Sequence, residues 1–373
     1  MKRNWEYKNI EECLEKVTVV SKLQTKDFLS KGKFPIVSQE VDYISGYWNN
    51  DSDVVRLFHP VVVFGDHSRV VKYIDFDFVV GADGVKILSP KDFLNPKFLY
   101  YFVKSADIPS LGYSRHYKLL REKDVPVPPL EEQSRIVAEL DLLTGIIDKQ
   151  NAQLKELDNL AQAIFYDMFG DPIENPKGWE IKTIQSVAEK YSDGPFGSNL
   201  KSEHYQQDGV RIIRLQNIGV NEFVDLDKAF ISEEHYEVLK KYSCYPGDVV
   251  IGTLGEPNLR ACVIPNSIYL AVNKADCILC RLKKDLITAI YFSYVMNEEK
   301  FVHAQCQAFS HGQTRARISA GQLKNAFIPL PPLSLQQSFA EKIQSIEKQK
   351  ETIRASIADT QKLLDYTMDK YFG

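Results

Sequence analysis

A long internal repeat is the feature that most constrains how this chain of 373 residues can fold. Residues 128–170 align without a gap with residues 331–373, at a constant offset of 203. Residues of the first copy that meet an identical residue in the second include Pro128, Leu130, Gln133, Leu160, Phe169 and Gly170. A fixed-offset repeat predicts two copies of one structural plan. We therefore expect a globular domain at 1–127, a long helix at 128–170, a linker at 171–178, a second domain at 179–330 and a second long helix at 331–373.

The two repeated segments are predicted to form a coiled coil. Apolar residues recur at alternating steps of four and three, from Ile136 to Met168 in the first copy and from Phe339 to Tyr371 in the second. The seam is interrupted by polar residues, namely Gln150, Lys350, Thr360 and Thr367. A seam that repeats every 3.5 residues faces a partner helix, and a double proline before each segment suits a helix start. Two ordinary amphipathic core helices are the alternative interpretation.

Chain connectivity predicts the direction of the helix pair. The linker 171–178 is short, and the second domain leads directly into the second helix. Because the termini of a domain usually lie close together, the second helix should start near the end of the first and run back. We expect an α/β (α+β) fold in which two similar β-rich domains are separated by an antiparallel coiled coil, with an approximate two-fold between the halves.

The two globular stretches share an order of features. They open with Trp5-Glu-Tyr-Lys-Asn-Ile10 and Trp179-Glu-Ile-Lys-Thr-Ile184. Each continues with short β-rich runs and a hairpin with a polar tip, at 60–74 and at 247–264. Each ends in a polar loop with the pattern G-x-[ST]-R, at 112–118 and at 312–317, before the proline run.

In this doubled order the features resemble the specificity subunit of type I restriction-modification systems, over essentially the whole chain. The resemblance implies that the globular stretches are target recognition domains, each reading one half of a bipartite DNA target. It also implies that the helices set the gap between the halves and dock the modification subunits. One departure is that residues 334–337 read SLQQ where 131–134 read EEQS, so the two docking surfaces need not be equivalent.

The resemblance also implies which partners and cofactors to expect. The partners would be double-stranded DNA, two methyltransferase subunits and, through them, ATP-dependent restriction subunits. The chain itself would be non-catalytic, with S-adenosylmethionine, ATP and magnesium bound by the partner subunits. Such a complex would serve phage defence in the cytoplasm.

Motifs for catalysis are missing from the residues themselves. A DNA methyltransferase needs a glycine-rich cofactor loop and an [ND]-P-P-[YF] motif, and this sequence has neither. It also lacks the G-x-x-x-x-G-K-[ST] loop of ATP-binding proteins. Asp66 and His67 could form a hydrolytic site with Asp248 as a further carboxylate, but aspartate is common at turns for its backbone hydrogen bonds.

Charge and cysteine content narrow the class further. The net charge is −4, and the acidity lies in residues 127–178, which carry ten acidic and four basic residues. The six cysteines are unevenly spaced, and Cys277 and Cys280 have zinc-like spacing without a second pair, so we expect buried reduced thiols. The polar start and the lack of an 18-residue apolar run predict no signal peptide and no membrane segment.

DNA reading requires polar side chains on loops that reach base edges and phosphates. In the first domain the candidates are Lys22, Gln24, Thr25, Lys26, His67, Ser68, Arg69, Ser114, Arg115, His116 and Lys118. In the second domain they are Phe196, Ser198, Asn199, Lys201, Asn258, Arg260, Ser310, His311, Gln313, Thr314, Arg315 and Arg317. For any one of them, the alternative interpretation is an ordinary solvated loop residue. Matching loops in both halves favour DNA contact by the set as a whole. Arg115 and Arg315 are the strongest single candidates.

Two other classes of function remain open from the sequence. A coiled-coil scaffold could join two protein-binding domains, and it would show no sequence-specific retention of DNA. A self-sufficient modification enzyme is opposed by the missing motifs, and it would transfer methyl groups without a partner.

Overall fold

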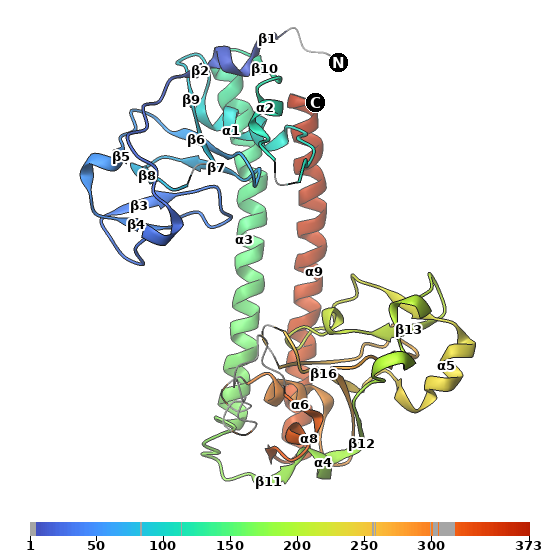
Figure 1. Cartoon of the computed structure of the whole chain (residues 1–373). Coiled ribbons are helices and arrows are strands. Elements are labelled where there is room, and N and C mark those ends of the chain that lie inside the picture. Colours follow the sequence, from blue (N-terminus) through green and yellow to red (C-terminus); the bar gives the residue numbers. More distant parts are fainter. Residues whose placement is uncertain are drawn as a thin grey trace. The chain divides into compact units, whose positions relative to one another are not determined.

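The structure is a computed structural model that describes residues 5–300, 305 and 318–373, apart from 83, 113, 256, 258 and 299 and the side chain of Ser198. The chain forms two compact units (Figure 1). Unit 1 comprises Met1–Gln153 together with Ile353–Gly373, and unit 2 comprises Leu154–Thr352. The long helices α3 (Leu130–Phe169) and α9 (Leu333–Phe372) each pass from one unit into the other.

Within each unit, segments of α3 and α9 pack antiparallel, which confirms the predicted helix pair. In unit 1 the start of α3 lies beside the end of α9, where Arg135 Nη2 donates to the Tyr371 hydroxyl at 3.2 Å. Further along, Gln150 Nε2 donates to Ser356 Oγ at 2.7 Å. In unit 2, Lys350 Nζ lies 2.7 Å from Asp158 Oδ1. Two of the polar interruptions of the seam, Gln150 and Lys350, therefore have polar partners on the opposite helix.

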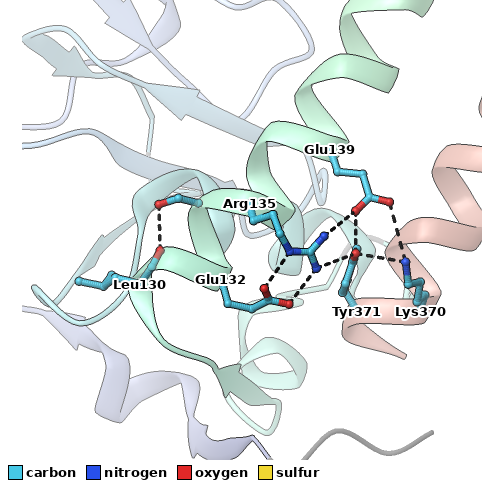
Figure 2. A network of polar contacts seen from close by, with 7 residues as sticks. Leu130, Glu132, Arg135, Glu139, Lys370 and Tyr371 are labelled. Carbon is cyan, nitrogen blue, oxygen red and sulfur yellow. Dashed lines mark hydrogen bonds and ion pairs between the residues drawn. The ribbon is translucent and has the colours of Figure 1, made fainter.

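Further contacts between the two helices differ in detail between the units. Figure 2 shows the polar network of unit 1, in which Arg135 binds Glu132 through two contacts of 2.8 Å and Tyr371 donates to Glu139 at 2.6 Å. In unit 2 the helices also meet through aromatic rings. Phe339 of α9 packs against Phe165 and Phe169 of α3, with ring centroids 5.8 and 5.2 Å apart.

Domain 1 is built from short strands and short helices. The strands are β1 (Glu6–Asn9), β2 (Leu14–Glu15), β3 (Phe34–Val37), β4 (Gly46–Trp48), β5 (Val54–Val55), β6 (Val61–Gly65), β7 (Val71–Ile74), β8 (Phe78–Val80), β9 (Val85–Pro90) and β10 (Asp124–Val127). The helices are α1 (Pro96–Ser105) and α2 (Tyr117–Leu120). The strands form two sheets, of order β2-β9-β6-β7 and β4-β3-β8-β5, and the antiparallel pair β1-β10.

Domain 2 repeats this topology with different residues. Its strands are β11 (Glu180–Thr183), β12 (Ala188–Ser192), β13 (Val210–Ile213), β14 (Ala229–Ile231), β15 (Ser243–Cys244), β16 (Val249–Gly252), β17 (Arg260–Val263), β18 (Ala271–Asn273), β19 (Cys277–Leu282) and β20 (Phe327–Leu330). Its helices are α4 (Ile184–Val187), α5 (Glu233–Leu239), α6 (Ala289–Met296) and α8 (Ala320–Leu323). The sheet orders β12-β19-β16-β17, β14-β13-β18-β15 and β11-β20 match those of domain 1 strand for strand.

Each domain shares one apolar core with the long helices. In unit 1, Phe98 and Phe102 of α1 belong to the same buried cluster as Ile136 and Leu140 of α3. In unit 2, Tyr291 and Phe292 of α6 belong to the same cluster as Phe339 and Ile343 of α9. Burial of this apolar surface is what attaches each domain to its helices.

The cysteines that the structure describes are free and buried, as predicted: Cys13, Cys244, Cys262, Cys277 and Cys280. Cys306 lies outside the described residues. Cys277 and Cys280 belong to different core clusters on the two faces of β19, so the two thiols do not converge on a shared ion. Burial raises the pKa of Cys280 to about 12, which keeps this thiol protonated and inert at neutral pH. Within the described part of the chain, no helix has the length and apolar character needed to span a membrane.

Candidate nucleic-acid interface

In domain 1 the turn between β8 and β9, residues 81–84, brings two of the predicted loops together. The segment 22–26 lies on one side, where Leu23 N donates to Val80 O at 3.0 Å and Ala82 N donates to Leu23 O at 2.7 Å. The hairpin tip 65–69 is bonded to the same turn, because Asp66 N donates to Gly84 O at 2.7 Å. The turn requires an unusual backbone, since Ala82 has a φ of 65°.

The loop 112–118 joins this group through Asp66, which is only 2% exposed. The backbone carbonyl of Asp66 accepts from His116 N at 2.8 Å, and its Oδ1 accepts from Tyr117 N at 2.8 Å. The ring of His67 contacts Ser114 O through Nδ1 at 3.1 Å. The described residues of segments 22–26, 65–69, 81–84 and 112–118 thus form one surface, which we name the domain 1 loop cluster. Three loops that were predicted to read DNA therefore converge on the turn between β8 and β9, although they are far apart in the sequence.

The hairpin tip of this cluster is held in a tight turn. Arg69 has a φ of 61°, and a Cβ atom added to Gly65 would lie 2.2 Å from Ser68 Oγ. Gln39, from the loop after β3, supports the tip: its Oε1 accepts from His67 N at 3.2 Å and its backbone carbonyl accepts from Ser68 Oγ at 2.5 Å. A rigid tip presents its side chains in one orientation, which base reading requires.

Domain 2 gathers its loops through the equivalent turn between β18 and β19. Asp276 N donates to Asp193 Oδ1 at 3.1 Å, and Thr253 N donates to Asp276 O at 3.0 Å. Ile318 N donates to Thr253 O at 3.3 Å, as His116 N does to Asp66 O in domain 1. We name the described residues of segments 193–201, 253–260 and 274–276, with Ile318, the domain 2 loop cluster. Gly194 allows the close approach, because a Cβ there would lie 2.2 Å from the backbone of Lys274.

The predicted residues of domain 1 divide by exposure. Those that are exposed on the loop cluster are Lys22, Gln24, Thr25, Lys26, Ser68, Arg69, Arg115 and Lys118. His67 and Ser114 are half-buried. Arg69 is partly engaged, since its Nη1 donates to Ile108 O at 2.9 Å. Whether any of these side chains contacts DNA stays a prediction.

His116 is a correction to the predicted set. Its side chain is fully buried, at 0% exposure, so it cannot reach a base or phosphate from where it lies. Its ring instead ties the loop together: Nε2 accepts from Leu111 N at 3.0 Å, and Nδ1 lies 3.0 Å from Asp66 O. Beside it, burial raises the pKa of Tyr117 to about 12, so this phenol stays neutral.

In domain 2 the described candidates include a second correction. Phe196, Asn199 and Lys201 are exposed on the cluster, with half of the Phe196 side chain accessible. Arg260 binds backbone carbonyls instead: its guanidinium donates to Ile218, Leu254, Pro257 and Leu215 at 2.5 to 3.1 Å. Because a guanidinium has five N–H donors, these bonds to four carbonyls leave little donor capacity for a nucleic acid. Arg260 therefore stabilises the loop.

The remaining candidates of domain 2 lie outside the described residues: Asn258, Ser310, His311, Gln313, Thr314, Arg315 and Arg317. The side chain of Ser198 also lies outside them, although its backbone belongs to the 193–201 segment.

The structure also places a cation in domain 2 that the sequence argument missed. Lys274 lies in the central turn of the cluster, where its backbone amide donates to Ile213 O at 2.9 Å. Its Nζ donates to the Tyr205 hydroxyl at 2.7 Å and lies 5.2 Å from the centre of that ring. Gly81 makes the same backbone bond in domain 1, to Val37 O. Only the topology reveals the position, because nothing in the sequence around Lys274 marks a loop that meets the others.

The family model described as type I restriction modification DNA specificity domain matches residues 2–159 and 176–359. The chain is 23% identical over 271 residues to the type I restriction enzyme MjaVIII specificity subunit of Methanocaldococcus jannaschii, a match that covers 68% of this chain and 61% of that one. It is 24% identical over 227 residues to the EcoR124I/EcoR124II specificity subunit of Escherichia coli, covering 57% and 54%. In both matches the chain spans less than two thirds of the relative's length.

A longer match and the structural comparison extend over nearly the whole chain. The putative MjaX specificity subunit of M. jannaschii is 23% identical over 391 residues, covering 92% of this chain and 87% of that one. The crystal structure of a type I restriction-modification S subunit from M. genitalium superposes with a TM-score of 0.57 at 16% identity, covering 100% and 97%. This structural likeness shows a shared fold.

Proposed function

Because the chain belongs to the family of type I restriction-modification DNA specificity domains, we propose that it is the DNA-specificity subunit of a type I restriction-modification complex. Each domain reads one half of a bipartite target in double-stranded DNA, and the long helices set the gap. The observation that carries this proposal is the repeated loop cluster. In domain 1, Asp66 N donates to Gly84 O and Asp66 O accepts from His116 N; in domain 2, Thr253 takes the same place between Asp276 O and Ile318 N. These equivalent bonds gather loops at the same end of the same topology.

The chemistry of the loops suits this role. In domain 1, Lys22, Lys26 and Arg115 offer positive charge for phosphates, and Gln24 offers an amide that can pair with adenine. In domain 2, Lys201 and Lys274 offer charge, and Asn199 offers the amide. An overall negative charge does not oppose this, because charge on one face governs DNA binding.

The proposed chain is non-catalytic and acts through partners. Methyl transfer belongs to modification subunits that carry S-adenosylmethionine, and ATP and magnesium serve restriction subunits that bind through them. The absence of both nucleotide-binding and methyltransferase motifs from the sequence supports this division.

Exposed apolar residues on the long helices support two docking surfaces for modification subunits. Leu160 in unit 2 and Leu363 in unit 1 are equivalent in the repeat, and they are 48% and 52% exposed. Tyr366, one turn beyond Leu363, is 67% exposed. Large apolar side chains that repeat on two helix segments favour burial against two copies of one partner. Because residues 131–134 read EEQS where residues 334–337 read SLQQ, we expect the two surfaces to bind with unequal strength.

The test is co-expression with the modification subunit of the same host, followed by selection of DNA from a random pool. We expect a complex with two modification subunits per chain that retains DNA with two fixed half-sites separated by a fixed gap. Retention without a sequence preference would favour the scaffold alternative. Methyl transfer by the purified chain alone would overturn the non-catalytic assignment.

A further inference from the structure

Gln133 and Gln336 are equivalent residues of the internal repeat, and both are completely buried at 0% exposure. Each lies in the first turn of a long helix, α3 or α9. A buried amide is stable only when its donors and acceptor are paired. The partners of these two side chains therefore show what the fold requires of them.

In unit 1 the Gln133 side chain joins three separate segments. Its Oε1 accepts from Asn95 N at 2.7 Å, and Asn95 is the residue that caps the start of α1. Its Nε2 donates to Phe93 O at 2.9 Å and to Pro128 O at 2.8 Å. One side-chain amide thus links the start of α3, the residue that follows strand β10 and the loop that leads into α1.

In unit 2 the Gln336 side chain makes the same three bonds. Its Oε1 accepts at 2.8 Å from the amide of Thr288, which caps α6. Its Nε2 donates to Leu286 O at 3.1 Å and to Pro331 O at 2.8 Å. The capping residues differ between the domains, and the glutamine and the backbone geometry are the same.

This bond set complements the apolar packing. Apolar contact between α1 and α3, or between α6 and α9, resists separation but has no preferred direction. Hydrogen bonds to backbone atoms are directional, so they fix the rotation and slide of the short helix against the long one. In unit 1, Lys97 and Asp141 add an ion pair of 2.7 Å across the same contact. Ile290 and Gln344 stand at those places in domain 2, so that pair is not repeated.

We propose that Gln133 and Gln336 are positioning residues that hold each recognition domain in one orientation on the long helices, and thereby determine selectivity for the gap between the half-sites. This inference rests on the proposed function. A change of one base pair in the gap moves a half-site by about 3.4 Å and turns it by about 35° around the duplex. Each domain must resist such a shift for one gap to be preferred.

The experiment uses the full chain in its complex with modification subunits. The variants are Gln133→Met and Gln336→Met, because methionine keeps the length of the side chain and removes its hydrogen bonds. The matched control is Gln150→Met, the same change in α3 at a half-buried position where Nε2 donates to Ser356 Oγ of the other helix. Dissociation constants are measured for duplexes with native half-sites and a gap that is native, one base pair shorter or one base pair longer.

For the wild type and Gln150→Met we expect a strong preference for one gap. For each glutamine variant we expect the preference to fall about tenfold, equivalent to about 1.4 kcal/mol, while the penalties for base changes inside the half-sites stay as in the wild type. A residue that served stability alone would weaken all duplexes equally. Hydrogen exchange at the amides of Asn95 and Thr288 confirms that the bond set has been broken.

An unchanged gap preference in both methionine variants, with those amides exchanging faster, would overturn the proposal. Should one methionine variant not fold, the other decides alone, because the two glutamines lie in different units. Should neither fold, Lys97→Met replaces them, because it removes the ion pair with Asp141 across the same contact at a partly exposed site. A fall in the gap preference then supports the proposal, and an unchanged preference overturns it. A wild-type complex with no gap preference at all would instead refute the proposed function.

Discussion

Replacing Asp66 by alanine should release the loop 112–118 from the domain 1 loop cluster. The carboxylate is buried, and its Oδ1 accepts from Tyr117 N at 2.8 Å. Its other oxygen lies 3.8 Å from Lys86 Nζ, whose side chain is one-third exposed at 34%. The substitution removes both contacts and leaves a backbone donor in a half-buried site without its acceptor.

The magnitude follows from the first contact. A hydrogen bond to a charged group contributes about 1.5–3 kcal/mol, and the long, partly solvated contact with Lys86 adds little. We therefore expect the loop to lose about 2 kcal/mol of stability against local opening, which is about a thirtyfold rise in the opening equilibrium. The backbone bond from His116 N to Asp66 O does not depend on the side chain, so the domain should remain folded.

Hydrogen exchange of the full chain measures this directly, with Tyr117 N as the reporter. Asp66→Asn is the matched control, because its amide oxygen can still accept from Tyr117 N and only the charge is lost. Binding to the first half-site should weaken in Asp66→Ala, and binding to the second should not. Unchanged protection of Tyr117 in Asp66→Ala, or equal loss of protection in domain 2, would refute the reasoning.

Three further outcomes follow from the same structure. Arg115→Ala should weaken binding to one half-site by about 1–3 kcal/mol if the contact is bidentate to a base. Arg315→Ala should weaken binding only to the other half-site. An equal loss of specificity at both half-sites in a binding assay would contradict the assignment of one domain to each half-site. Burial lowers the pKa of Lys350, but hydrogen bonds to Asp158 and Glu347 raise it more. Its contribution to stability should therefore be present up to about pH 10 and be lost as pH rises through the higher folded pKa, a dependence that urea unfolding should show in the wild type and not in Lys350→Met. A heptad inserted into both α3 and α9 adds about 10 Å, or about three base pairs, so the complex should select a wider gap or stop binding; selection of the original gap would show that the helices do not set it.

The long helices and the doubled domains could be predicted because their signals are periodic. A seam with a period of 3.5 residues and a repeat at one offset do not depend on what each side chain contacts. Even the interruptions at Gln150 and Lys350 were visible as polar residues in an apolar seam. Their cross-helix partners, Ser356 and Asp158, became visible only when the register of the two helices was known.

The roles of single polar residues could not be predicted in the same way. His116 and Arg260 have the residue types and loop positions of DNA contacts, but the structure pairs both with backbone groups. Asp66 stood out in the sequence as a turn residue beside a histidine, and it proves to anchor a loop 51 residues further along the chain. A sequence shows which donors and acceptors exist, and only the fold shows which of them are already satisfied.

The backbone hydrogen bonds also indicate which arginine of domain 2 is equivalent to Arg115 of domain 1. The motif G-x-[ST]-R pairs Arg115 with Arg315. In the structure, however, Ile318 N bonds to Thr253 O as His116 N bonds to Asp66 O, so Ile318 occupies the place of His116. The residue before Ile318 in the chain is Arg317, which makes Arg317 the counterpart of Arg115 by this register. The two alignments differ by two residues. Reading of the second half-site is therefore to be compared in Arg315→Ala and Arg317→Ala together, since the motif assigns the contact to the first and the backbone register assigns it to the second.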